Sequence, residues 1–211
     1  MTPETDEASL SPRALETRER ILDAAESVFV QRGFEAATTR EIAALSETNV
    51  ATTYRYFAGK EALYAAVLRR RIGPLIELMD EFARESDKPR AAANAIRAVL
   101  ERLADHEGTT RLVYREIVAD GPLAEELTKT LFEPLLDRVC AELRAGSRVD
   151  REMEPFVAAI FVHLSFSHIA LAPLLSRVFD REMLSPESLA RQVEVIQAAA
   201  GLGRAGFPTD E

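Results

Sequence analysis

The sequence is poor in cysteine and has no long uninterrupted apolar run. Its 211 residues include one cysteine, Cys140, which excludes an internal disulfide framework. Cys140 lies at helical spacing among apolar residues, so we interpret it as a small buried hydrophobe. The chain has no stretch of about 18 or more consecutive apolar residues, which argues against a membrane span. The acidic, polar start of the chain is unlike a secretory signal, and we therefore expect a cytoplasmic protein.

Positive charge is also scarce in this chain. There are 26 lysines and arginines against 35 acidic residues, which gives a formal net charge of −9. A protein that coats nucleic acid without sequence preference needs many cations for the phosphates, so the composition argues against that role. It still allows a small DNA-reading surface on an acidic body. The hydrophobic content of 47% is typical of a globular protein and too high for disorder.

The short motifs of common enzymes are absent from the sequence. It has no glycine-rich phosphate loop, no G-x-S-x-G motif, no H-E-x-x-H motif and no cluster of cysteine and histidine. His163 and His168 are five residues apart, about 140° around a helix, so they do not present two metal ligands on one face. We therefore predict a protein that is not an enzyme and holds neither a metal nor a cofactor.

Apolar residues recur at helical spacing through the chain, and no segment alternates for long with a period of two, so the fold is predicted to be all-α. The first helix is expected to end at Gly33 in a left-handed cap. A long helix follows residue 59, and its Pro74 removes one backbone hydrogen bond and should kink it. Further helices are predicted over residues 91–105, 112–119, 123–145 with a break near Pro134, 156–175 and 185–200.

Two short segments near the N-terminus are the most informative part of the sequence. Thr38 with Glu41 three residues later matches a capping box, and Asn49 is a good N-cap for a second helix. Only residues 46–48 remain for a turn between them. A short helix, a tight turn and a second helix form the DNA-reading motif, in which the second helix enters the major groove. The expected inward residues are Ile42, Leu45, Tyr54 and Phe57.

This order of features resembles the TetR family of transcriptional regulators, over about residues 18 to 64. The residues that carry the resemblance are Arg20 to Ala25, Phe29 with Gly33 and Phe34, Thr38, Arg40 to Ala43, Tyr54 to Phe57, and Lys60 to Leu63. The acidic residues at 1–12 are expected to form a disordered tail. The resemblance implies a three-helix DNA-binding domain at 13–60 and a larger helical ligand-binding and dimerisation domain at 61–205. It also implies a homodimer through the last two helices, which reads a palindromic double-stranded DNA operator because both share a two-fold axis. A small-molecule effector would release this repressor from its operator.

The same resemblance assigns roles to residues around the two short helices. Thr38 and Tyr56 match positions that hold phosphates. Lys60 does so as well, at the start of a helix where backbone amides favour an anion. Arg40 and Thr53 match positions that reach the bases. These assignments depend on the resemblance alone.

The sequence departs from the family pattern in and after the turn. Glu47 stands where the family usually has glycine, and a left-handed residue with a side chain costs about 1 kcal/mol. Thr48 replaces an apolar residue, which weakens the anchor of the turn. Val50 stands where many relatives have lysine or arginine, and it can contact a thymine methyl. We therefore expect a recognition helix with few direct hydrogen bonds, helped by Thr52, Thr53 and DNA shape. Tyr54 matches a position that touches the DNA backbone, and its burial in the core is an equal alternative.

The larger predicted domain offers residues for an effector site, because an apolar cavity with a few polar groups suits a small molecule. The candidate lining residues are Tyr114, His163, Phe166 and Ser167, each of which can also be ordinary core. Two alternatives remain, a helical small-molecule-binding module or a protein-interaction module without DNA binding. The run of arginines at 69–71 can face either DNA or solvent.

Overall fold

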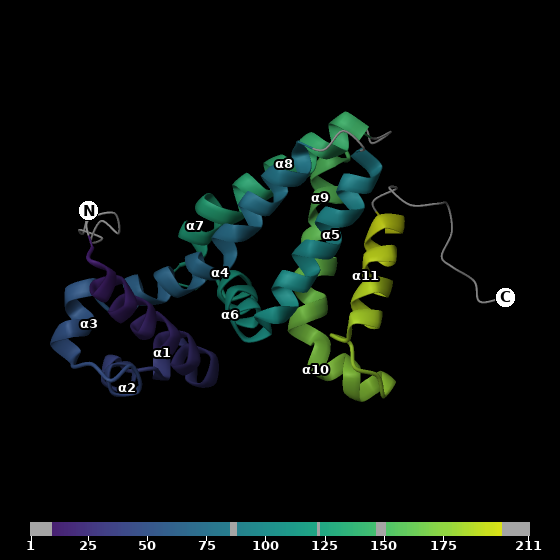
Figure 1. Cartoon of the computed structure of the whole chain (residues 1–211). Helices are drawn as coiled ribbons and strands as arrows, with labels where there is room; N and C mark the ends of the chain where they lie inside the picture. Colours follow the sequence, from purple (N-terminus) through teal and green to yellow (C-terminus); the bar gives the residue numbers. More distant parts are fainter. Residues whose placement is uncertain (1–9, 85–87, 122, 147–150, 200–211) are drawn as a thin grey trace. The chain divides into compact units, whose positions relative to one another are not determined.

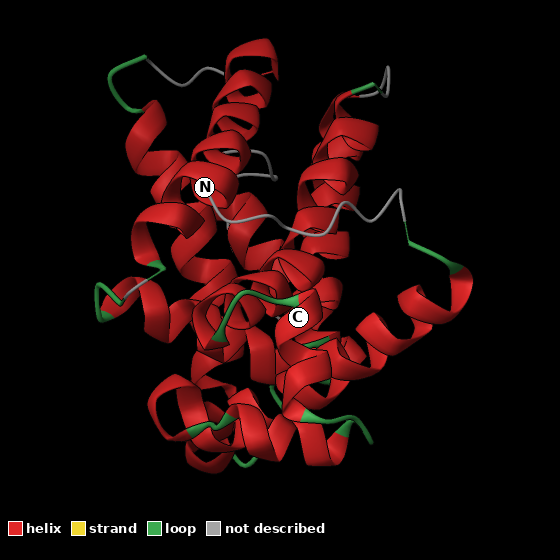
Figure 2. Ribbon diagram, turned by 90° about the vertical axis from the view of Figure 1, so that its left-hand side faces the viewer, coloured by secondary structure: helices red, strands yellow, loops and turns green. Residues whose placement is uncertain are grey.

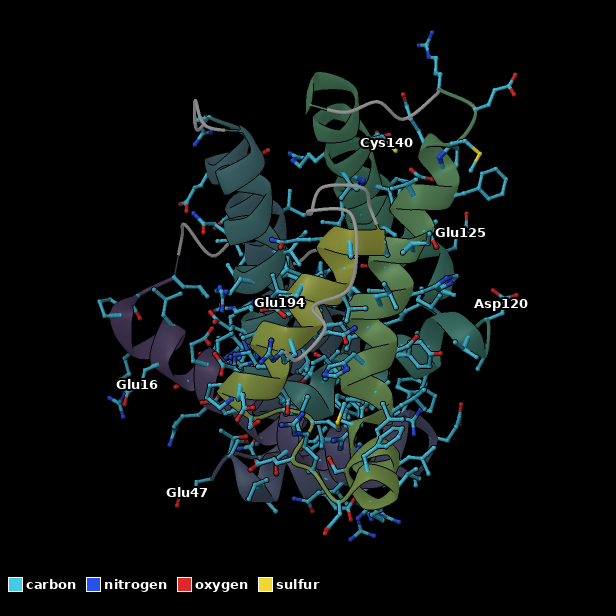
Figure 3. All side chains as sticks on the ribbon, turned by 90° about the vertical axis from the view of Figure 1, so that its right-hand side faces the viewer. Glu16, Glu47, Asp120, Glu125, Cys140 and Glu194 are labelled. Carbon is cyan, nitrogen blue, oxygen red and sulfur yellow. The ribbon has the colours of Figure 1, made fainter. Side chains whose placement is uncertain are left out.

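The computed structural model describes residues 10–84, 88–121, 123–146 and 151–199 of the chain, and Figure 1 shows the order of its helices. Across these ranges the regular elements are helical and no strand occurs (Figure 2), which confirms the all-α prediction. Most of the acidic tail expected at 1–12 lies outside the described residues. Cys140, which lies on α8 (Glu133–Gly146) and is labelled in Figure 3, is half-buried rather than fully buried.

The chain divides into two compact units, of which the first ends at Arg71 and the second begins at Ile72. The N-terminal unit contains α1 (Pro12–Ala36), α2 (Thr39–Leu45), α3 (Val50–Tyr56) and the first part of α4 (Lys60–Ala83). The sequence places the end of the DNA-binding domain at residue 60. The first turns of α4 nevertheless pack with α1 and belong to the same unit.

The C-terminal unit contains the rest of α4 and a series of further helical elements. Two of these elements, η2 and η3, are short π-helical turns. These elements are α5 (Lys88–Asp105), α6 (Glu107–Val118), α7 (Ala124–Leu127), η2 (Thr128–Phe132), α8 (Glu133–Gly146), α9 (Glu154–Val162), η3 (His163–Ser167), α10 (His168–Phe179) and α11 (Pro186–Ala199). The helical run continues through Pro134 instead of breaking there, and its irregular part is η2, which ends just before α8 begins.

Three aromatic rings form the centre of the N-terminal unit. The rings of Phe29 and Phe34 lie 4.9 Å from that of Tyr64, which is fully buried on α4. Gly33 has the expected positive φ, +77°, and turns Phe34 back toward this cluster, but it kinks α1 instead of ending it, since the helix continues to Ala36. The end of α1 is therefore packed directly against the start of α4.

The continuous run from α9 through η3 to α10 is more exposed than its composition suggests. Phe166 and Ile169 are buried, but Phe156, Leu171 and Leu174 are exposed. The segment Glu154–Phe179, with a mean hydropathy of 1.8, is long and apolar enough to cross a membrane, contrary to the sequence-based expectation that no such segment exists. One such helix is weak evidence of a membrane protein, because the core helix of a soluble protein passes the same test.

The fully buried Ser165, in η3, gives a stability prediction. Its Oγ has no hydrogen-bond partner among the described residues, and an unsatisfied buried hydroxyl is destabilising. Replacing Ser165→Ala should therefore raise the free energy of unfolding by about 1 kcal/mol in chemical denaturation. The matched control is Ser176→Ala, which loses the hydrogen bond that Ser176 Oγ accepts from the Met183 amide at 3.1 Å and should lower stability. A loss of stability in Ser165→Ala would show that this hydroxyl has a partner.

Candidate nucleic-acid interface

Helix α2 begins with the predicted capping box. The Glu41 amide donates to Thr38 Oγ1 at 3.2 Å, and the Glu41 carboxylate accepts from the Thr38 amide at 3.2 Å. The Thr38 hydroxyl also donates to that carboxylate at 3.0 Å, while Arg32 lies 3.4 Å from its other oxygen. These contacts fix the start of α2, because they satisfy two amides that lack helical partners.

The turn after α2 closes with the two hydrogen bonds of a Schellman motif. The Thr48 amide donates to the Ala43 carbonyl at 2.9 Å, and the Glu47 amide donates to the Ala44 carbonyl at 3.2 Å. Glu47 has a φ of +53°, so the predicted left-handed position is confirmed and carries a side chain. The turn therefore keeps glycine-like geometry without glycine.

A pair of hydroxyls stands where the family has an apolar anchor. Ser46 is buried, its Oγ donates to the Ala43 carbonyl at 3.2 Å, and this Oγ lies 2.9 Å from Thr48 Oγ1. The turn is held to the end of α2 by hydrogen bonds rather than by an apolar contact.

Helix α3 buries one side and exposes the other. Its N-cap is Asn49, whose Oδ1 accepts from the Thr52 amide at 2.7 Å. Thr53 is 2% exposed and faces the core with Tyr56, three residues later on the same side of the helix, so it does not lie where it would reach bases. Tyr54 is 52% exposed, which corrects the inward assignment and removes the core alternative.

The remaining predicted residues divide in the same way between the surface and the interior. Arg40 and Thr38 are exposed, and Val50 and Thr52 are half-buried. Ile42 and Phe57 are buried as expected. Leu45, also expected inward, is 56% exposed because it lies at the last residue of α2, beside the turn.

Arg55 is a surface cation that the sequence reasoning did not select. Its Nη2 donates to the Tyr56 hydroxyl at 3.3 Å, and its guanidinium carbon lies 5.1 Å from the centre of the Tyr56 ring. Tyr56 is thus mostly buried and supports Arg55, which is exposed near the end of α3. The sequence does indicate this role, because Arg55 is a basic residue between Tyr54, which is exposed, and Tyr56, which is buried.

Lys60 lies at the start of α4 and reaches the end of α1. Its Nζ donates to the carbonyl oxygens of Phe34 at 3.0 Å and Glu35 at 3.3 Å, and it lies 4.4 Å from the centre of the Phe34 ring. Carbonyls at a helix end lack helical partners, and a lysine is a favourable donor to them. The expected phosphate-binding residue therefore has a structural role in this unit.

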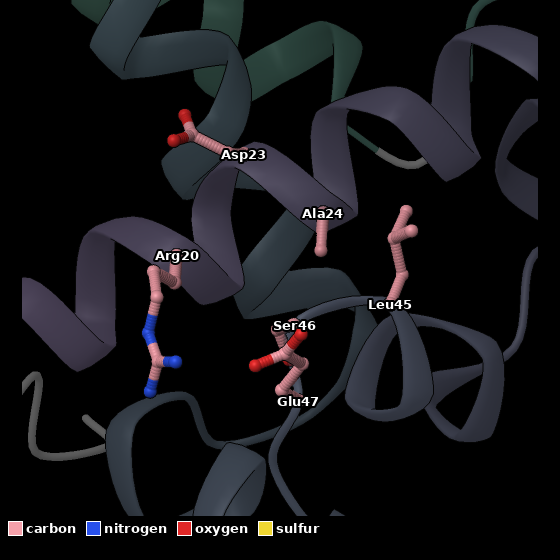
Figure 4. Close-up of a pocket in the computed structure, with 6 residues that line it drawn as sticks. All are labelled: Arg20, Asp23, Ala24, Leu45, Ser46 and Glu47. Atoms are coloured by element: carbon pink, nitrogen blue, oxygen red, sulfur yellow. The ribbon is translucent and has the colours of Figure 1, made fainter.

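An open hollow lies between α1 and the α2–α3 turn (Figure 4). It is lined by Arg20, Asp23, Ala24, Leu45, Ser46 and Glu47. Arg20 on α1 and Glu47 in the turn extend toward the same space, so the hollow has charges of both signs. The side chain of Leu45 contributes to this hollow instead of to the core.

The charge of the chain is unevenly distributed. Residues 12–71 contain ten lysines and arginines and eight acidic residues, a net charge of +2, whereas the whole chain carries −9. Arg70 and Arg71, in the run whose orientation was left open, form ion pairs with carboxylates of α1. Arg40 and Arg55 are the exposed cations of α2 and α3 in the described chain. The two short helices therefore carry a small basic face on an acidic protein.

The four candidate effector residues lie on two elements of the C-terminal unit. On α6, Tyr114 is half-buried, whereas Phe166 in η3 is buried and its ring lies 5.5 Å from that of Phe132. Ser167 is half-buried and His163 is exposed, so His163 does not lie with Phe166 in the interior. The elements α6 and η3 pack against each other.

His168, the residue after η3, is buried and was not selected from the sequence. Its Nε2 lies 2.9 Å from the Met183 carbonyl oxygen, and burial lowers the pKa of its imidazole. This contact ties α10 to the connection before α11.

A capped helix-turn-helix supported by α1 and the first turns of α4, and followed by a larger helical unit, is typical of a class of bacterial DNA-binding regulators. The sequence profile described as "Bacterial regulatory proteins, tetR family" matches residues 21–67. The transcriptional regulator RutR of Escherichia coli K12 is 36% identical over 192 residues, which cover 88% of this chain and 89% of RutR. The chain belongs to the TetR family, and it is a DNA-binding transcriptional regulator.

Solved structures share the same fold. A TetR-like regulator from Rhodococcus sp. RHA1 has a TM-score of 0.71 at 18% identity, with 91% of this chain and 97% of that one covered. FadR from Bacillus subtilis, solved in complex with stearoyl-CoA, has a TM-score of 0.71 at 15% identity, with 88% and 99% covered. These similarities confirm the predicted architecture, an N-terminal helix-turn-helix domain and a helical C-terminal domain.

The left-handed Glu47 gives a prediction about the turn. Glu47→Gly should raise the free energy of unfolding by about 1 kcal/mol, because glycine adopts this conformation without steric cost. The measurement is thermal or urea denaturation, and the control is Glu77→Gly on an exposed position of α4, which should lower stability. If both substitutions lowered stability, the side chain of Glu47 would contribute more to the free energy of unfolding than its left-handed conformation costs.

Proposed function

We propose that the protein is a dimeric repressor, which binds a palindromic operator and is released by a small molecule. The observation that supports this most is the basic exposed face of two capped short helices in a chain with a net charge of −9. An acidic body lowers affinity for random DNA, so binding depends on the local contacts of this face. The two recognition helices of a dimer would need to lie about 34–36 Å apart to read successive major grooves.

The contacts proposed for DNA follow the exposed side of α2 and α3. Arg40 is proposed to reach a base, since arginine can donate two hydrogen bonds to a guanine edge. Val50 and Tyr54 offer apolar surface to thymine methyl groups, and Thr52 a hydroxyl. Arg55, supported by Tyr56, is proposed to bind a phosphate. In this proposal Thr53 and Lys60 stabilise the N-terminal unit and do not contact DNA. Thr38 both caps α2 and contacts a phosphate.

Selection from a random DNA pool tests the proposal, and a two-fold symmetric consensus is the expected result. On that consensus, Arg55→Ala should weaken binding to all sequences alike and reduce the slope of log affinity against log salt by about 1. Arg40→Ala should instead relax the preference at one base pair of each half-site, by about 1–3 kcal/mol.

The control for both variants is Arg97→Ala, an exposed arginine on α5, which should leave affinity and salt slope unchanged. Recovery of no enriched sequence would favour the protein-interaction alternative. An unchanged salt slope in Arg55→Ala would remove that side chain from the phosphate contacts.

The proposed dimer forms through the last two helical segments, α9–α10 and α11. Leu171, Leu174 and Val178 are exposed and are spaced three and four residues apart, so they share one side of α10. An exposed apolar stripe of this kind is typical of a surface that another protein covers. A second copy of the chain accounts for the apolar character of this helix in a cytoplasmic protein, without a membrane.

The dimer gives a prediction that is independent of DNA. Leu174→Glu should convert the protein to a monomer in sedimentation velocity, because an unpaired carboxylate would be buried in the interface. The matched control is Val118→Glu, another strongly exposed apolar position, at the end of α6, which should leave the dimer intact. A wild-type monomer at micromolar concentration would contradict the proposal.

The proposed effector site is near η3, where Phe166 meets Phe132 and where α6 supplies Tyr114. Ser167 and the buried hydroxyl of Ser165 supply polar groups, which a small-molecule site needs for orientation. The stearoyl-CoA complex shows that a protein of this fold binds an organic ligand, and it supports ligand binding here without naming the ligand. A compound that releases a labelled operator from the protein would identify the effector, and its turnover would favour an enzyme.

A further inference from the structure

Helix α4 is the segment of chain that belongs to both units. It extends over Lys60–Ala83, and the boundary between the units falls within it, between Arg71 and Ile72. The part before the boundary packs with α1 in the N-terminal unit. The part after it belongs to the C-terminal unit.

Before the boundary, two arginines hold α4 to α1. Arg71 donates from Nε to Glu26 Oε1 at 2.8 Å and from Nη2 to Glu26 Oε2 at 2.7 Å, and Arg70 Nη2 reaches the same carboxylate at 2.7 Å. Arg70 Nη1 also lies 3.0 Å from Glu19 and 2.8 Å from Asp23. We refer to these five side chains as the α1–α4 clamp.

The clamp is stronger than an ordinary surface ion pair. The side chains of Glu26 and Arg70 are 14% and 19% exposed, so water screens their charges only in part. The bidentate bond from Arg71 to one carboxylate also fixes orientation. The first turns of α4 should therefore move with α1 as one rigid body.

After the boundary, α4 is tied to a different helix. Arg138 on α8 donates from Nη2 to Asp80 Oδ2 at 2.9 Å, and its Nε bonds the other carboxylate oxygen. The hydrogen bond from Arg138 lowers the pKa of the Asp80 carboxyl, so this pair is charged at neutral pH. The two parts of α4 are thus attached to different partners.

Two neighbouring residues between these attachments, Gly73 and Pro74, each make α4 less stable as a helix. Pro74 has no backbone N–H, so the Arg70 carbonyl loses its helical donor. Gly73 comes just before it, and glycine is a poorer helix former than alanine. A Cβ added at Gly73 would meet no atom within 4 Å, so packing in the chain does not require glycine there.

We propose that Gly73 and Pro74 form a hinge in α4, and that this hinge sets the range of half-site spacings which the dimer accepts on DNA. The inference rests on the proposed dimeric operator binding. The α1–α4 clamp keeps the reading helices rigid on one side of the hinge, and the Asp80–Arg138 pair fixes the other side.

The distance between the two operator half-sites to which the dimer binds is a sensitive measure of such a hinge. Each base pair inserted between half-sites moves them about 3.4 Å apart and turns one relative to the other by about one tenth of a helical turn. Two rigidly connected reading units would match one spacing only. A bend in α4 on each side of the dimer allows neighbouring spacings to bind.

The test uses the full-length protein and a series of operators with one or two base pairs added to or removed from the centre. The wild type should bind the neighbouring spacings within about tenfold of the optimum. The double variant Gly73→Ala, Pro74→Ala, which restores the missing donor, should keep its affinity at one spacing and lose more than about tenfold at the others. Glu77→Ala, at an exposed position after the hinge, is the matched control and should keep the wild-type range.

A second variant tests the clamp. Glu26→Gln removes the carboxylate that both arginines share and should widen the range of accepted spacings. Equal ranges in the wild type and the double variant would overturn the hinge. So would a changed oligomeric state of the single variant Gly73→Ala, because the space at Gly73 would then be used for packing. If the wild type binds no operator in the series, including a single half-site, the proposed function fails instead.

Discussion

The structure depends on the attachment of α1 to the start of α4. The helices α2 and α3 have seven residues each, too few to be stable alone. The clustered rings of Phe29, Phe34 and Tyr64 and the bonds from Lys60 to the end of α1 join α1 to α4. Helix α2 packs on α1, and α3 packs on α2. Because this support fixes one side of α3, it also determines which side is left for DNA.

Much of the N-terminal unit follows from local sequence. The capping box, the Asn49 cap and the left-handed turn residue involve neighbours within a few positions, so their chemistry can be read from the sequence. The role of Lys60 was not predictable in this way, since its acceptors lie about 25 residues earlier. Thr53 was expected on the exposed side and Tyr54 was left between the two sides, because a helix of two turns has no long apolar stripe to set its orientation.

In the C-terminal unit, composition predicted helices but not what covers them. A strongly apolar segment predicts burial, yet Leu171, Leu174 and Phe156 remain exposed in the single chain. The sequence does not distinguish a residue buried within the chain from one covered by a second copy. The positions of η2 and η3 likewise depend on tertiary packing, because no residue type specifies a π-turn.

The three non-glycine residues with positive φ in the described chain are all acidic, namely Glu47, Asp120 and Asp180. After each of them, the next amide bonds back to a carbonyl in the last turn of the preceding helix, as in the Schellman turn of α2. Codons for glutamate and aspartate differ from glycine codons at one nucleotide, so single mutations reach the relaxed form at all three turns. A gain in stability therefore lies one mutation away at each of these turns.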